Sequence, residues 1–279
     1  MARTKATTRV PMDSLRKTAL VAGVFYLLTF VSIPTLALYT RVHEADYIVG
    51  AGPDTAVIFG GILEIIVALA GIGTAVALYP VVKRQNQAAA LGFVGARVLE
   101  AAAIYVGIAS LLTIVTLRQA GVGADGLVTG QALVGMYDSM FLLGQSLIPP
   151  VNALLLGSLL YRSGLVPRIL PLLGLIGAPL LVAGHIGTMF GLWGTFGQWG
   201  RPNVLTGIGV LLVAGWEFSL GVYLVVRGFR PEGLAKLDAP RPSRHPRSFD
   251  ADGEHANVPS LEPHPGEAQS ANERARTRG

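Results

Sequence analysis

Apolar residues in this chain are gathered into six long runs, separated by short stretches that carry most of the charged and turn-forming residues. Each run is close to the roughly 20 residues that an α-helix needs to cross the hydrocarbon core of a bilayer. The pattern therefore predicts an all-α fold, a polytopic transmembrane helical bundle. Its six spans are expected at residues 18–39, 56–79, 88–117, 131–161, 169–193 and 203–226.

The composition supports a membrane protein. Hydrophobic residues make up 51% of the 279 residues and charged residues only 14%, whereas a soluble domain has about 25% charged residues. The net charge of +5 does not indicate nucleic acid, because the basic residues are spread over loops and tail and form no single patch. The chain has no cysteine, which excludes disulfides, iron–sulfur clusters and thiolate catalysis. The lipid bilayer is the expected partner.

The two ends of the chain differ from the six runs. Residues 1–17 are basic and precede the first run, as in a signal peptide, but that run has spanning length and is expected to remain as the first helix. Residues 227–279 are rich in Pro, Ser, His, Arg and Glu, which predicts a disordered tail. The basic start of this tail either contacts anionic lipid or is simply solvated.

The distribution of Lys and Arg predicts the orientation. The N-terminus carries five of these residues, the loops after the second and fourth spans two each, and the start of the tail three. The three alternate loops carry one each, namely Arg41, Arg118 and Arg201. Basic loops face the cytoplasm, so both termini are expected there. We expect a multi-pass protein of a prokaryotic plasma membrane.

The fourth run is interrupted by Pro149 and Pro150. Two prolines inside one helix predict a kink, with two backbone carbonyls left without their usual donors. Asp138, Gln145 and Asn152 follow at seven-residue spacing and so share one helix face, which indicates a span that faces the bundle interior. Asp138 itself is expected at the outer interface, where it needs no partner.

Three stretches resemble a known family: RKTALVAGVFYLLTF (16–30), ALGFVGARVLEA (90–101) and NALLLGSLLYRSGLVPRILPLLGLIGAP (152–179). Together they resemble the DUF4386 family over roughly residues 14–228. The resemblance implies a six-helix integral membrane architecture and brings no assigned activity. The PPVN at 149–152 departs from a family pattern that is usually more aromatic just before the asparagine.

Ionisable and amide side chains inside the spans are the candidate site residues, because such groups usually face the interior and pair there. At 1.5 Å per residue, four of them lie roughly 10–18 Å from the cytoplasmic ends of their helices. This midplane cluster consists of Arg97, Glu100, Asn152 and Glu217. An outer layer, about 24–25 Å from the same ends, consists of Glu64, Gln145 and His185. Arg97 is expected to pair with Glu217 or Glu100.

Each layer has two interpretations. The midplane cluster either holds the helices in register or lines a polar cavity for a substrate, an ion or a proton. His185 and Glu64 either form a proton relay, or His185 is neutral and donates to a backbone carbonyl.

No catalytic motif is present. The chain has no His-x-x-x-His pair, no Gly-x-Ser-x-Gly and no spaced carboxylate set, so neither a metal nor a cofactor is expected. The sequence favours a protein that binds or transports a small molecule or ion at the midplane cluster. A non-catalytic sensory, regulatory or scaffold subunit is the alternative, and an intramembrane enzyme is the least favoured class. The pattern predicts no particular oligomeric state.

Overall fold

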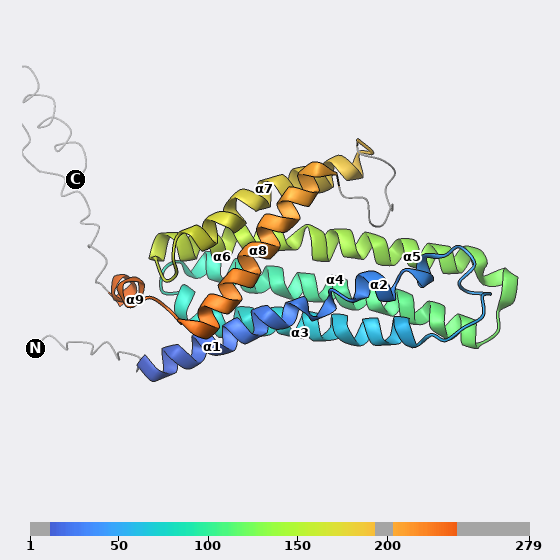
Figure 1. Cartoon of the computed structure of the whole chain (residues 1–279), viewed down its shortest axis with the longest axis horizontal. Helices are drawn as coiled ribbons and strands as arrows, with labels where there is room; N and C mark the ends of the chain where they lie inside the picture. Colours follow the sequence, from blue (N-terminus) through green and yellow to red (C-terminus); the bar gives the residue numbers. More distant parts are fainter. Residues whose placement is uncertain (1–11, 193–202, 239–279) are drawn as a thin grey trace, which may run out of the picture. The chain divides into compact units, whose positions relative to one another are not determined.

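The computed structural model describes residues 12–192 and 203–238, and all regular structure in these ranges is helical (Figure 1). The long helices are α1 (Met12–Leu28), α3 (Thr55–Val82), α4 (Gln87–Gln119), α5 (Leu127–Met140), α6 (Ile148–Ser163), α7 (Ile169–Met189) and α8 (Val204–Val226). The short ones are η1 (Thr29–Ser32), α2 (Thr35–Leu38), η2 (Arg41–His43), η3 (Gly123–Gly126), the π-helical η4 (Phe141–Ser146) and α9 (Pro231–Asp238).

Within the described ranges, six helical stretches are long and apolar enough to cross a membrane, which confirms the all-α, six-span prediction. Most of their ends lie within four residues of the predicted ones. The fourth stretch differs, because it begins at Gly123. It consists of the successive helical segments η3, α5, η4 and α6. The predicted end of the fifth span, residue 193, lies outside the described residues.

Six of the long helices close a ring. α1 packs on α3, α3 on α4, α4 on α6, α6 on α7, α7 on α8, and α8 returns to α1. In Figure 1 the α7–α8 pair crosses the other helices at an angle, and α5 extends the line of α6 along α4. Helices that are distant in sequence, such as α4 and α8, therefore face one shared interior.

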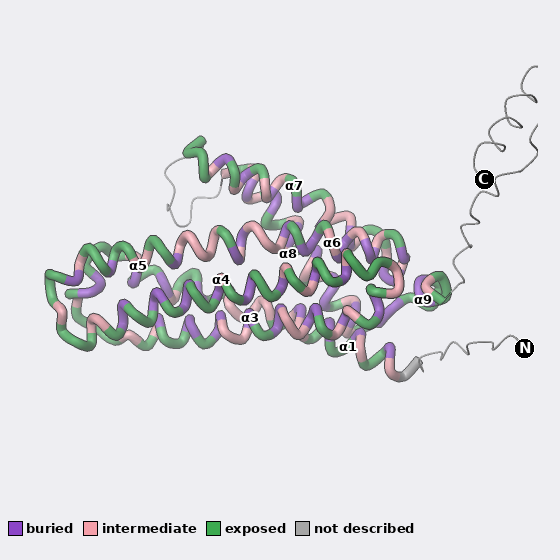
Figure 2. Tube along the Cα trace, turned by 180° about the vertical axis from the view of Figure 1, so that it is seen from behind, coloured by how far each residue is buried: buried purple, intermediate pink, exposed green. Residues whose placement is uncertain are grey.

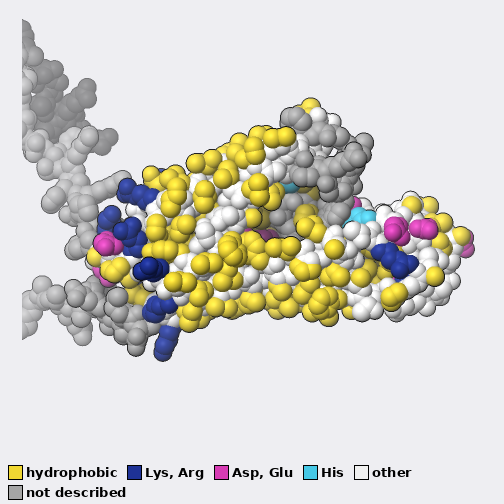
Figure 3. Space-filling model, viewed as in Figure 1, with side chains coloured by type: hydrophobic (Ala, Val, Ile, Leu, Met, Phe, Trp, Pro, Cys, Tyr) yellow, Lys and Arg dark blue, Asp and Glu magenta, His cyan; other side chains and the backbone are white. Residues whose placement is uncertain are grey.

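Exposed and buried positions alternate along the long helices (Figure 2). On the face seen in Figure 3, apolar side chains cover the flank of the bundle and charged side chains gather at its two ends. We call one of them the basic end, and the other the opposite end. The basic end carries Arg16, Lys17, Lys83, Arg84, Arg162, Arg168, Arg227, Arg230 and Lys236. Among the described residues, the opposite end has only Arg41 and Arg118, and Arg97 lies inside the bundle.

Glycines let α7 and α8 approach closely, as small residues do between membrane helices. A Cβ added at Gly209 would lie 2.6 Å from the Leu181 backbone nitrogen, and one at Gly174 would lie 2.6 Å from the ring of Trp216. The Trp216 ring therefore occupies space that a larger residue at position 174 would fill. This packing sets the rotation of α8 and places the next residue, Glu217, toward α4.

The double proline does not kink a helix from within, so that prediction was wrong. The chain forms the π-helical turn η4, and α6 then begins at Ile148 with Pro149 and Pro150 in its first turn. Backbone N–H groups in a first turn have no partner inside the helix, so proline loses nothing there. The break falls before the prolines, at the turn that carries Gln145.

The prediction of disorder from residue 227 onward was wrong for its first part. Helix α9 follows α8 directly, and Leu234 on it is buried against the basic end. The Arg230 backbone N–H donates to the Leu165 carbonyl at 2.8 Å, and Arg84 pairs with Asp238 at 3.2 Å. The averaged tail composition concealed these few apolar residues. The rest of the tail, 239–279, and most of the basic N-terminal segment, 1–11, lie outside the described residues.

Candidate functional site

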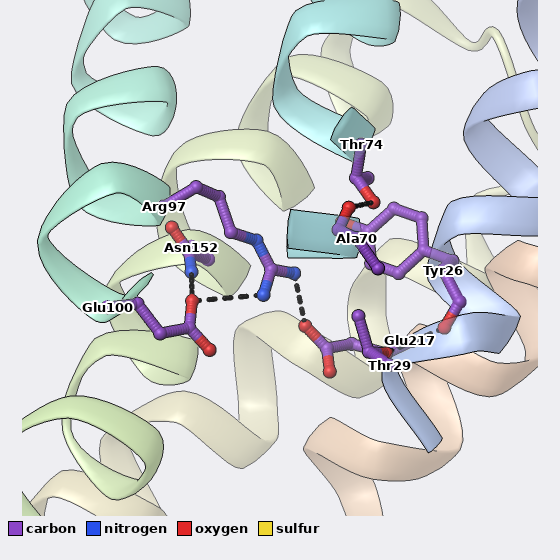
Figure 4. Close-up of polar contacts among 8 residues, drawn as sticks. All are labelled: Tyr26, Thr29, Ala70, Thr74, Arg97, Glu100, Asn152 and Glu217. Carbon is purple, nitrogen blue, oxygen red and sulfur yellow. Dashed lines mark hydrogen bonds and ion pairs between the residues drawn. The ribbon is translucent and has the colours of Figure 1, made fainter. Parts of the chain in front are cut away.

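Arg97 joins two carboxylates in the middle of the bundle (Figure 4). Its Nη1 donates to Glu100 Oε2 at 3.0 Å, and its Nη2 donates to Glu217 Oε1 at 2.7 Å. Residues three apart on a helix share a face, which explains the first pair, and the ring of helices brings α8 to α4 for the second. The prediction that Arg97 pairs with Glu217 or Glu100 is confirmed, and both pairs occur together.

Asn152 completes the cluster from a third helix. Its Nδ2 donates to Glu100 Oε2 at 2.9 Å, on the same oxygen that Arg97 contacts. The side chains come from α4, α6 and α8, and two of them are deeply buried, with Arg97 2% and Asn152 0% exposed. The structure thus brings together all four residues of the midplane cluster.

Two aromatic rings flank the guanidinium, and the sequence analysis missed both. The Arg97 Cζ lies 5.5 Å from the ring centroid of Tyr26 on α1 and 5.8 Å from that of Phe93 on α4. On α3, Gly71 lies against the same side chain, since a Cβ there would be in ordinary contact with Arg97 Cδ at 3.6 Å. Apolar runs hide such aromatics, and only the four-residue spacing of Phe93 and Arg97 could have indicated this contact.

Several buried polar atoms around the cluster have no hydrogen-bond partner among the described residues. They are Arg97 Nε, Asn152 Oδ1, the Tyr26 hydroxyl and Trp216 Nε1. The Tyr26 and Trp216 rings pack edge to face, with centroids 6.3 Å apart. Each such atom costs about 1–3 kcal/mol when it is buried without a partner. The surroundings of Arg97 thus contain both donors and an acceptor that could bond a further polar group.

The charges of the cluster do not balance. One guanidinium faces two carboxylates, so the ionised cluster carries one net negative charge. Glu217 is the more accessible carboxylate, with 12% of its side chain exposed. The described ranges contain no group of three or more His, Asp or Glu side chains that could hold a metal ion. A proton or a cationic solute would neutralise the surplus charge.

The predicted outer layer comes together only in part. Glu64 Oε1 accepts hydrogen bonds from the Tyr137 hydroxyl at 2.7 Å and from Gln145 Nε2 at 3.3 Å. His185 is half-buried on α7, which packs on α6 and α8, and no described contact joins it to Glu64 or Gln145. The sequence analysis missed Tyr137, because it counts as an apolar position in the hydrophobic pattern although its hydroxyl is polar.

Asp138 has a partner, contrary to the prediction. His43 Nε2 lies 3.0 Å from Asp138 Oδ1, and His43 Nδ1 lies 2.6 Å from the Tyr39 carbonyl oxygen. Burial lowers the pKa of His43, but the hydrogen bonds to Asp138 and Tyr39 outweigh it, so the pKa is raised above its ordinary value. Sequence reasoning treated His43 as a loop residue, because its partner lies 95 positions away.

The connection between the first two spans is held by a second polar group. Asp54 accepts hydrogen bonds from Tyr47, Arg118 and Gln119, and the Arg118 guanidinium lies 4.7 Å from the centre of the Tyr47 ring. Burial raises the pKa of Asp54, but these three donors together hold it below its ordinary value. Burial and the neighbouring Asp54 raise the pKa of Tyr47 to about 12. This group anchors the segment that carries His43.

The cavities lined by described residues include three that lie away from the midplane cluster. One of about 260 Å³ opens at the opposite end beside His43, Glu44 and Gln131. A second, of about 420 Å³, lies beside Asp54 and Arg118, and a third, of about 390 Å³, is an apolar groove on α8 near the basic end. The midplane cluster lines none of these three.

The comparisons with known proteins agree with the resemblance noted in the sequence. A family model described as a domain of unknown function, DUF4386, matches residues 21–228, a range that contains both polar layers. The comparisons with curated proteins and with solved structures give no match. A match over this much of the chain, together with the six membrane-spanning stretches, shows that the chain belongs to the DUF4386 family of integral membrane proteins.

Proposed function

We propose that this multi-pass membrane protein binds a small cationic or protonatable solute at the midplane cluster and carries it across the membrane. The observation that supports this proposal is the combination of surplus negative charge and unpartnered buried atoms around Arg97. A cluster that served only to hold helices together would be expected to pair its buried groups fully. A guest with a positive charge and hydrogen-bonding groups would satisfy both the charge and the free atoms.

The proposed orientation places the basic end in the cytoplasm, in a prokaryotic plasma membrane. Nine described Lys and Arg residues lie at that end and two at the other, which follows the excess expected for cytoplasmic loops. In this orientation Glu217 lies inside the bundle, at about half the depth of α8. The break between α5 and α6 supports transport, because interrupted helices often mark the sites of transporters.

A non-catalytic sensory, regulatory or scaffold role is the second candidate. It is favoured by the dense burial of Arg97 and Glu100 and by cavities that lie elsewhere. In that case the cluster would join α4, α6 and α8 without ever binding a solute. The two proposals differ in whether a small molecule stabilises the protein.

Thermal unfolding of the detergent-purified full chain separates them. Wild type, Glu217→Gln and the matched control Glu232→Gln are melted with alkali cations, with ammonium and simple organic amines, and at several pH values. Glu232 is an exposed acid on α9, with 71% of its side chain accessible. A solute at about 100 times its dissociation constant stabilises the folded state by about 2.7 kcal/mol.

We expect one class of cation to raise the melting temperature of wild type and of Glu232→Gln but not of Glu217→Gln. Acidic pH should raise it more in the first two proteins than in Glu217→Gln, because protonation of His43 stabilises all three. A panel that shifts none of the three proteins, or shifts all three equally, contradicts a solute site at the cluster. That result would support the regulatory or scaffold role.

A further inference from the structure

A second buried carboxyl, Glu64, lies away from the midplane cluster and differs from it in one respect. Glu64 is nine residues from the start of α3 at Thr55, about 14 Å along the helix axis from the opposite end. It is only 1% exposed. Glu100 and Glu217 share a guanidinium, whereas no Lys, Arg or His among the described residues forms an ion pair with Glu64.

The surroundings of Glu64 supply hydrogen-bond donors and apolar groups but no positive charge. Tyr137 and Gln145 both donate to its Oε1. The two arginines of the opposite end are engaged elsewhere, since Arg118 bonds to Asp54 and Arg41 to a backbone carbonyl. The neighbouring core is aliphatic and consists of Val67, Ala68, Ala101, Ile104 and Ile108. An ionised carboxylate without a partner is very costly in such a place, and a buried acid becomes neutral instead.

Two unpartnered atoms at this site point the same way. Glu64 Oε2 and the Tyr39 hydroxyl are both buried and have no hydrogen-bond partner among the described residues. The Tyr39 hydroxyl faces the Glu64 carboxyl, and its ring packs edge to face on Tyr137 with centroids 5.3 Å apart. A hydrogen on Oε2 makes that oxygen a donor, and the Tyr39 oxygen is the acceptor beside it.

We propose that Glu64 is a proton-binding site, which holds a proton on Oε2 and shares it with the Tyr39 hydroxyl oxygen in a hydrogen bond. On release, the Oε2–H bond breaks, the carboxylate keeps the electron pair, and the proton becomes bonded to a water oxygen. Uptake is the reverse. This site stands whether or not the midplane cluster binds a solute.

Tyr39 and Tyr137 face Glu64 with their hydroxyls. Beyond them, the two imidazole nitrogens of His43 bond the Tyr39 carbonyl oxygen and Asp138. The Tyr137 ring lies 6.2 Å from the imidazole, centroid to centroid, and a proton does not pass through an aromatic ring. The proposed site is therefore the Glu64 carboxyl with the Tyr39 hydroxyl, and neither His43 nor His185 is part of it.

Infrared spectroscopy tests the proton directly, because a protonated carboxyl has a carbonyl stretch that is separate from those of carboxylates and amides. We expect this band at neutral pH in wild type and in the exposed control Glu232→Gln, and its loss in Glu64→Gln. Glutamine has the shape of the neutral acid, so the variant is expected to fold. Absence of the band from wild type at neutral pH, or a band of undiminished intensity in Glu64→Gln, overturns the proposal.

The hydrogen bond to Tyr39 is tested with Tyr39→Phe, which removes the hydroxyl beside Oε2, and with His43→Gln as the control. We expect the position of the band to change in Tyr39→Phe and to stay the same in His43→Gln, because a carbonyl stretch responds to the hydrogen bond that its own carboxyl donates. An unchanged band in Tyr39→Phe overturns the assignment of Tyr39 as the acceptor. Loss of the band on adding sodium at constant ionic strength shows a metal cation displacing the proton and overturns the assignment of the site to protons.

Discussion

Replacing Arg97 by methionine should destabilise the protein strongly, because it strands two carboxylates in the bundle interior. Methionine keeps much of the length of the side chain, so the change mainly removes the charge and two ionic hydrogen bonds of 3.0 and 2.7 Å. Hydrogen bonds to charged groups contribute about 1.5–3 kcal/mol each, and breaking a buried ion pair costs about 3–5 kcal/mol. We therefore expect a loss of about 3–6 kcal/mol, against a total stability of about 5–15 kcal/mol for typical proteins.

The assay is thermal unfolding in detergent, together with the yield of monodisperse folded protein. The informative control is the neutral triple variant, Arg97→Met with Glu100→Gln and Glu217→Gln. This variant removes the unpaired carboxylate charges, but it still lacks the contacts of the arginine side chain. We expect it to recover more than half of the lost stability, because amides are far less costly to bury than unpaired carboxylates.

Two results would refute this reasoning. If Arg97→Met melts at the wild-type temperature and expresses normally, the two ion pairs contribute no net stability. If the triple variant is no more stable than the single variant, the loss comes from packing against Tyr26 and Phe93 and not from charge.

Two further predictions concern the opposite end. Tyr137→Phe removes a hydrogen bond of 2.7 Å to Glu64 and should cost about 1–2 kcal/mol; melting curves of wild type and Tyr137→Phe that coincide would contradict this. Because the folded state raises the pKa of His43, the pair with Asp138 should stabilise the protein fully below the unfolded pKa of about 6.5 and lose that contribution as pH rises through the folded value. Melting temperature measured against pH should show this decline in wild type and not in His43→Gln, and parallel curves would contradict it.

The sequence predicts how deep each candidate site residue lies along its helix, and this depth alone groups the residues into layers. Arg97, Glu100, Asn152 and Glu217 lie at similar distances from the ends of their spans, so they had to share a layer once the spans were known. The same calculation grouped Glu64 with Gln145, and these two do meet. It also grouped them with His185, which makes no described contact with either, because depth does not say which helices are neighbours.

Contacts made by residues outside the spans, or by ordinary aromatics inside them, could not be predicted in this way. His43 lies in a connection, and its partner Asp138 is 95 residues away. Tyr26, Tyr39 and Tyr137 lie in or beside apolar stretches, where their hydroxyls leave no mark in the pattern. Their roles depend on side-chain directions that are set only when the helices pack.

The sequence by itself determined that the chain crosses the membrane six times, because hydrocarbon admits only apolar stretches whose backbone groups are satisfied within a helix. It also determined the depths of the buried polar groups and the concentration of basic residues at one end. Only the tertiary structure decided that α8 closes the ring beside α4, so that Arg97 meets a carboxylate 120 positions away. It likewise decided that Glu64 faces tyrosines and no basic group. Helix neighbours depend on close packing at residues such as Gly174 and Gly209, which the hydrophobic pattern does not distinguish from any other apolar position.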